Sequence, residues 1–78
     1  MRMSDFINGE VKFFNNDRGF GFILYNNGEN EIFFHFSALP VPDDRDNIFT
    51  GTDVEFQIAE GRRGPEATNV IIKSEVSV

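Results

Sequence analysis

The chain has 78 residues, 40% of them hydrophobic, with no cysteine and a formal net charge of −6. This length allows one domain with a small core and excludes two, and the absence of cysteine excludes disulfides and thiolate metal sites. The acidic charge argues against nucleic acid unless basic side chains gather locally, because phosphates repel an acidic partner.

Location and cofactors are predicted from the same composition. No apolar run approaches the about 20 residues that span a bilayer, and the first five residues lack the apolar core of a signal peptide. We therefore expect a cytoplasmic protein that does not associate with membranes. His35 is the single histidine, and no carboxylates stand at ligand spacing around it, so no metal or other cofactor is predicted. We expect one domain over residues 1–78, with a core at about residues 8–73 and frayed ends at 1–6 and 74–78.

Five strands are predicted in chain order, and no helix. Runs rich in β-branched and aromatic residues predict the first three strands, and alternation with a period of two predicts the fourth. The expected strands are residues 10–14, 20–25, 31–36, 54–59 and 67–72.

Turn residues separate these strands. Asn, Asp and Gly fill residues 15–17, 19 and 26–28, a Gly-Arg-Arg-Gly-Pro turn spans 61–65, and a longer loop with two prolines covers 40–50. Five short strands with short turns predict an all-β, closed antiparallel barrel, because closure removes exposed strand edges.

Ten of the residues are phenylalanines, and seven of these lie between Phe13 and Phe36. That is more than the interior needs. A plausible core already consists of Val11, Phe14, Ile23, Ile32, Phe34, Leu39, Val54, Phe56, Ile58, Val70 and Ile72.

Strand alternation assigns the surplus rings to the outer surface. If Ile23 points inward, Gly21 does too, while Phe20 and Phe22 point outward. If Ile32 and Phe34 point inward, Phe33 and His35 point outward. A bulge is predicted in the first strand, because Phe13 and Phe14 are adjacent and Lys12 has to reach solvent. The result is an aromatic face, which we define as Phe13, Phe20, Phe22, Phe33 and His35, with Phe36 at its end.

Flat exposed rings flanked by Lys12 and Arg18 suit unpaired bases, since stacking contributes about 1–3 kcal/mol per base and tolerates any sequence. Alternation alone leaves a second interpretation open, in which Phe20 and Phe22 fill the core. That choice turns Gly21 to solvent, and the same choice in the third strand buries His35.

Four segments resemble the cold-shock domain family. Residues 18–23 (RGFGFI) resemble the first ribonucleoprotein motif, and residues 32–38 (IFFHFSA) resemble the second in its cold-shock form. Residues 9–15 are similar to the family's opening strand, and residues 61–70 to its closing segment. The resemblance spans residues 9–72 with the motifs in the family's order.

The resemblance implies a five-stranded antiparallel barrel of the oligonucleotide-binding (OB) fold. It also implies binding of single-stranded RNA and single-stranded DNA, RNA chaperone activity, and effects on transcription or translation. Transferred by position, the contact residues are Lys12, Phe13, Arg18, Phe20, Phe22, Phe33, His35, Phe36 and Arg63.

Several positions depart from the family pattern. Phe13 stands where tryptophan is usual, and its smaller ring predicts weaker stacking. Glu66 stands where glutamine is common, and a carboxylate cannot donate a hydrogen bond. The loop over residues 40–50 lacks the usual Gly-Phe pair, so Phe49 is assigned no contact and is aligned with core-side positions. The hairpin at 26–28 is slightly longer than usual.

The sequence allows comparison with two other classes of function. A protein-interaction module could use the aromatic face to bind a partner chain or a second copy. We expect a monomer, and a weak dimer is the alternative. An enzyme is not predicted, because His35 and Ser37 have no third group to complete a relay and no phosphate-binding glycine loop is present.

Overall fold

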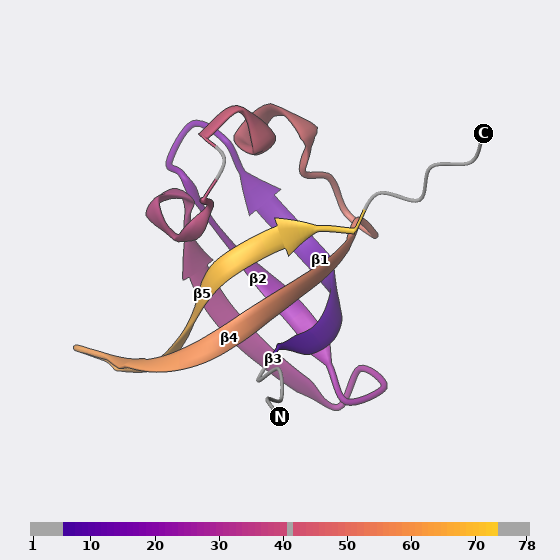
Figure 1. Ribbon diagram of the computed structural model, residues 1–78, viewed down its shortest axis with the longest axis vertical. Coiled ribbons are helices and arrows are strands. Elements are labelled where there is room, and N and C mark those ends of the chain that lie inside the picture. Colours follow the sequence, from indigo (N-terminus) through magenta and orange to yellow (C-terminus); the bar gives the residue numbers. More distant parts are fainter. Residues whose placement is uncertain (1–5, 41, 74–78) are drawn as a thin grey trace, which may run out of the picture.

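Five strands close into a barrel in the order β1-β2-β3-β5-β4, shown in Figure 1. The computed structural model describes residues 6–40 and 42–73, so the fraying expected at 1–6 and 74–78 lies outside the described residues except at Phe6. The strands are β1 (Ile7–Asn15), β2 (Phe20–Tyr25), β3 (Asn30–His35), β4 (Asp53–Gly61) and β5 (Gly64–Ile72). All pairings are antiparallel except that of β3 with β5. The predicted all-β, five-stranded closed barrel is confirmed.

The predicted bulge in the first strand is present. Val11 pairs with Ile23 and Phe13 pairs with Phe22, so Lys12 is the extra residue of β1. The bulge changes which face the following side chains occupy. As a result Phe13 lies on the outside of the barrel, while Phe14 stacks on Phe34 with ring centroids 5.5 Å apart.

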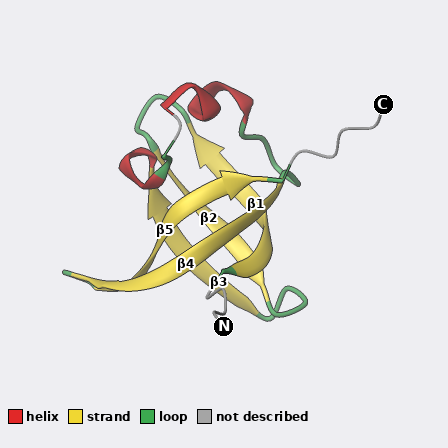
Figure 2. Ribbon diagram, viewed as in Figure 1, coloured by secondary structure: helices red, strands yellow, loops and turns green. Residues whose placement is uncertain are grey.

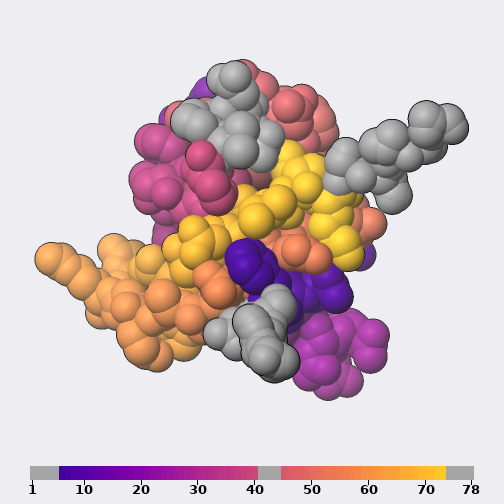
Figure 3. Space-filling model, in the orientation of Figure 1, coloured from indigo at the N-terminus to yellow at the C-terminus, as the bar shows by residue number. Residues whose placement is uncertain are grey.

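The turn between β2 and β3 is built from three residues in the left-handed region. Asn26, Asn27 and Gly28 have φ values of 58°, 61° and 84°. Asparagine and glycine adopt this conformation at least steric cost, which explains their choice here. At the β4–β5 hairpin, Gly61 pairs with Gly64 around a two-residue turn. The β4–β5 hairpin stands out from the rest of the molecule in Figure 3.

Among the described residues, the core is made of ten buried side chains: Val11, Ile23, Ile32, Phe34, Leu39, Ile48, Val54, Phe56, Ala67 and Val70. Phe14 and Ile72 pack against it half-buried. The prediction of Ile58 as a core residue was wrong, because its side chain is 42% exposed. The pairing of β4 with β1 ends at Phe56, so Ile58 lies beyond the edge of the barrel.

Among the described residues, the predicted loop at 40–50 contains the 3₁₀ helix η2 (Pro42–Asn47), and a second 3₁₀ helix, η1 (Phe36–Ala38), follows β3. Figure 2 shows both at one end of the barrel, with the β2–β3 turn at the other. The third strand therefore ends at His35, one residue earlier than predicted. Ile48 is buried after η2, whereas Phe49 is 63% exposed and does not take a core position. Within the described residues, no helix is long and apolar enough to cross a membrane.

Candidate nucleic-acid interface

Strand register brings the four phenylalanines of the aromatic face together on β1, β2 and β3. Phe13 pairs with Phe22, which in turn pairs with Phe33, and Phe20 pairs with His35. Directly opposite residues of antiparallel strands point to the same face. Ring centroids are 5.7 Å apart for Phe13 and Phe22, 5.8 Å for Phe22 and Phe33, and 5.9 Å for Phe20 and Phe33.

The rings point outward, as the first interpretation predicted. Phe13 is 38% exposed, and Phe20, Phe22 and Phe33 are half-buried. These rings are partly buried because they pack against one another. Phe13 and Phe20, for example, meet edge to face. The alternative with Phe20 and Phe22 in the core is wrong, because Ile23 occupies the interior on β2.

Gly21 allows the close approach of β1 and β2 beneath these rings. A Cβ added there would overlap the carbonyl oxygen of Phe13 and lie 2.9 Å from Cα of Phe14. Both obstacles are backbone atoms, which cannot move without disturbing the pairing. Glycine is therefore required between Phe20 and Phe22 for the two strands to pack this closely.

His35 is held in place by the start of η1. The backbone N–H of Ser37 donates to its Nδ1 at 3.2 Å, and the Ser37 hydroxyl lies 3.0 Å from the same nitrogen. Because Nδ1 accepts a hydrogen bond, the neutral ring carries its proton on Nε2. Nε2–H is thus left as a donor at the end of the aromatic face.

Phe36 lies at the end of the aromatic face, and its ring packs against two other side chains. The Arg45 guanidinium carbon lies 4.2 Å from the ring centroid, and the His35 centroid is 4.5 Å away. Arg45 is itself fixed, since Nε and one terminal nitrogen donate to Asn16 at 3.0 and 2.9 Å. Arg45 is not among the residues that the sequence predicted, because its partners lie on distant segments and leave no local pattern.

Cations surround the face, but they are not equivalent. Arg18 and Arg63 border an open cleft of about 400 Å³ together with Phe20, Phe22, Phe33 and His35. Lys12 instead forms an ion pair with Glu31 at 3.0 Å. The positive charge at the cleft therefore comes from Arg18 in the β1–β2 connection and from Arg63 in the β4–β5 turn.

Known proteins resemble the chain over most of its length. Residues 7–73 match the family model described as "'Cold-shock' DNA-binding domain". The major cold shock protein CspA of Bacillus cereus is 51% identical over 65 residues, covering 83% of this chain and 94% of that protein. The cold shock-like protein CspB of Escherichia coli is 47% identical over 70 residues, covering 90% and 97%. The cold shock protein CspD of Bacillus subtilis is 47% identical over 64 residues, covering 82% and 94%. With its RGFGFI motif leading into β2 and its IFFHFSA motif running from β3 into η1 of a closed barrel, the chain belongs to the cold-shock domain family.

Proposed function

We propose that the protein binds single-stranded RNA and single-stranded DNA by stacking bases on its aromatic face. The observation that carries this proposal is the set of outward rings on three adjacent strands, bordered by Arg18 and Arg63 in one open cleft. Stacking uses the π-face common to all bases and so tolerates any sequence. The description of the matching family as a DNA-binding domain supports the same function.

The proposed contact surface consists of the residues to which the family resemblance assigns nucleic-acid contacts. Rings would stack on bases, Arg18 and Arg63 would attract phosphates, and His35 would stack and donate from Nε2. The full set is Lys12, Phe13, Arg18, Phe20, Phe22, Phe33, His35, Phe36 and Arg63. Arg45 adds a further cation beside Phe36.

The same binding supports a role as an RNA chaperone and a regulator of transcription or translation. A ligand that binds only the open form of a nucleic acid shifts the equilibrium towards that form. Bases in a duplex are stacked and paired, so their faces are closed to the rings of the protein. Weak hairpins would therefore open as the protein binds their single strands.

Fluorescence anisotropy with a labelled oligothymidine and a labelled oligouridine tests the proposal. We expect micromolar or tighter binding to both and little binding to a duplex of equal length. Phe33→Ala should weaken binding by about 5- to 150-fold, which corresponds to the loss of one stacked base. Phe33→Leu should also weaken binding, because it keeps apolar surface but removes the flat ring.

The matched control is Ile71→Ala, which removes apolar surface from a side chain that is 40% exposed on β5. It should leave affinity unchanged. Equal affinity for duplex and single strands, or equal losses for Phe33→Ala and Ile71→Ala, would show that stacking on the aromatic face is not the mode of binding.

A further inference from the structure

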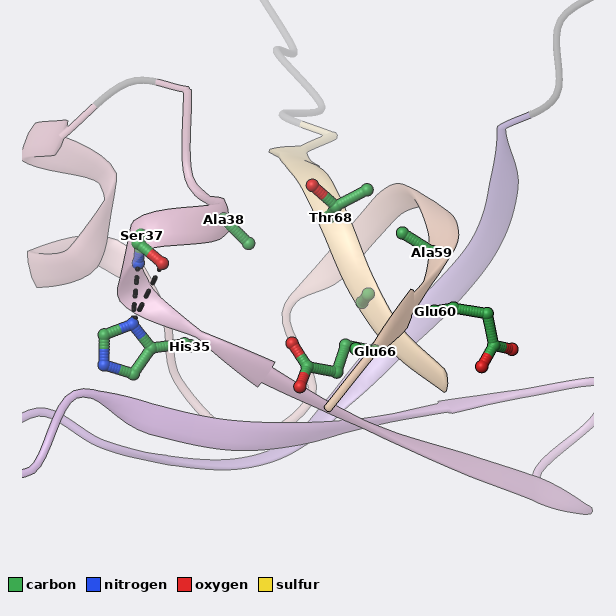
Figure 4. A pocket seen from close by; sticks show the side chains of 9 residues that line it. His35, Ser37, Ala38, Ala59, Glu60, Glu66 and Thr68 are labelled. Carbon is green, nitrogen blue, oxygen red and sulfur yellow. Dashed lines mark hydrogen bonds between the residues drawn. The ribbon is translucent and has the colours of Figure 1, made fainter. Parts of the chain in front are cut away.

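A small cavity continues from the aromatic face towards β5. It has a volume of about 150 Å³ and is lined on one side by His35 and Ser37 and on the other by Glu66 and Thr68, as Figure 4 shows. His35 also borders the cleft over the rings, so the two spaces share a wall. Pockets for whole small molecules measure about 300–1,000 Å³. This cavity is smaller and suits the polar edge of a single base.

The cavity exists because β3 and β5 separate. Among the described residues their pairing consists of one position, Phe33 with Glu66. Beyond it the chain leaves β3 and enters η1, which lines the cavity together with β5. Glu66 therefore stands next to a ring of the aromatic face, at the point where the strands part.

The carboxylate of Glu66 is aimed into this cavity. Its side chain is half-buried and lies against Gly61, where an added Cβ would overlap it. Figure 4 shows the carboxylate turned towards the side that His35 and Ser37 form. In the part of the chain that the structure describes, neither oxygen of Glu66 has a hydrogen-bond or ion-pair partner. No hydrogen-bonding group of the described residues therefore competes with a ligand for this carboxylate, one oxygen of which, Oε2, packs against Gly61.

A carboxylate only accepts hydrogen bonds, and the four bases differ in the donors that they offer. Guanine presents N1–H and the N2 amino group side by side, which match the two oxygens of a carboxylate. Cytosine and adenine each present one amino group beside an acceptor. Thymine and uracil present one N–H between two carbonyl oxygens, which a carboxylate repels. Hydrogen bonds to an ionised acceptor are also about twice as strong as neutral ones.

We propose that Glu66 is a specificity-determining residue that makes the protein prefer guanine at the position next to the base stacked on Phe33. This inference rests on the proposed stacking function, because the rings deliver the base to the cavity. The other stacking positions stay tolerant of sequence.

The test uses heptathymidine and seven variants in which one guanine is moved through the strand. We expect the wild-type protein to bind the best guanine variant about fivefold or more tightly than heptathymidine, as for one well-placed base contact. Replacing that guanine with inosine, which lacks the N2 amino group, should lose most of the gain. Replacing it with 7-deazaguanine, which keeps both donors, should retain the gain.

Glu66→Gln is the decisive variant, because it keeps the shape of the side chain while replacing one acceptor oxygen with a donor. It should abolish the guanine preference and still bind heptathymidine. Glu55→Gln makes the same change of charge on β4, outside the cavity, and should keep the preference.

An unchanged preference in Glu66→Gln, or equal binding of all eight strands by the wild type, would overturn this inference while leaving the stacking function in place. Failure of the wild type to bind heptathymidine would overturn both.

Discussion

Lys12 on β1 and Glu31 on β3 form an ion pair across the intervening strand β2, with Nζ 3.0 Å from Oε1. The two side chains are 48% and 43% exposed. Exposed pairs of this kind contribute about 0–1 kcal/mol, so a phosphate can compete for the lysine. Glu31 nevertheless opposes that exchange, because it partly neutralises a cation at the edge of the aromatic face.

Glu31→Gln should therefore tighten binding to single strands. With Lys12 released, one more phosphate can be neutralised, and the slope of log K against log[salt] should become steeper by about 0.7. Anisotropy titrations at four salt concentrations measure both quantities. Glu55→Gln is the control for net charge, and it should raise affinity without changing the slope. Identical slopes for the wild type and Glu31→Gln would show that Lys12 makes no phosphate contact.

The wild-type protein should show a shallow salt dependence for a nucleic-acid binder. Arg18, Arg45 and Arg63 are the cations beside the rings that carry no carboxylate partner among the interactions of the described residues. Three phosphate contacts predict a slope of about −2 for a single strand. Arg63→Gln should bring the slope closer to zero by about 0.7. Arg62→Gln, at the neighbouring exposed position of the same turn, is the control and should keep it. A slope much steeper than −3 would mean that other cations contact phosphate.

Phe13→Trp should tighten binding, because the larger ring offers more surface for stacking at a position that is 38% exposed. The chain contains no tryptophan, so the substitution also introduces a unique fluorophore whose quenching reports a stacked base. We expect a gain of a few-fold, up to about tenfold for 1.4 kcal/mol of added stacking. Phe13→Leu should change affinity in the opposite direction. Quenching without any gain in affinity would show that ring size at this position does not limit binding.

Gly21→Ala should destabilise the fold rather than affect binding directly. The new methyl group would meet backbone atoms of Phe13 and Phe14, and overpacking of this kind typically costs about 1–3 kcal/mol. Gly28→Ala is the control, because a Cβ there meets nothing within 4 Å and only the φ of +84° opposes it. Left-handed strain alone costs about 1–2 kcal/mol. Urea unfolding measures both, and a smaller loss for Gly21→Ala than for Gly28→Ala would refute the argument from close strand packing.

The sequence alone predicted the barrel, and it favoured outward rings on β2 without excluding the other choice. On β2, either Ile23 or the rings of Phe20 and Phe22 point inward. The second choice exposes Gly21, and the same choice on β3 buries His35. Local patterns of this kind are readable because neighbouring residues of a strand point to opposite faces whatever the rest of the fold does.

Alternation wrongly predicted that Ile58 is buried. A period of two indicates which face a residue occupies, but not where the neighbouring strand β1 stops pairing with β4. The pairing of β1 with β4 decides that point, and it stops at Phe56. The burial of Ile48 and exposure of Phe49 have the same origin, because η2 sets the direction in which the chain returns to the barrel.

By itself, then, the sequence predicted five strands, a bulge in the first of them and an aromatic face as the favoured one of two arrangements, because these depend on patterns within short segments of the chain. Only the tertiary structure decided that Arg45 packs on the ring of Phe36, that Glu31 pairs with Lys12, and that Glu66 lies beside Phe33 with no hydrogen-bond or ion-pair partner among the described residues. The physical reason is that a contact between distant segments depends on how the strands close around the core, and no periodicity within one strand carries that information.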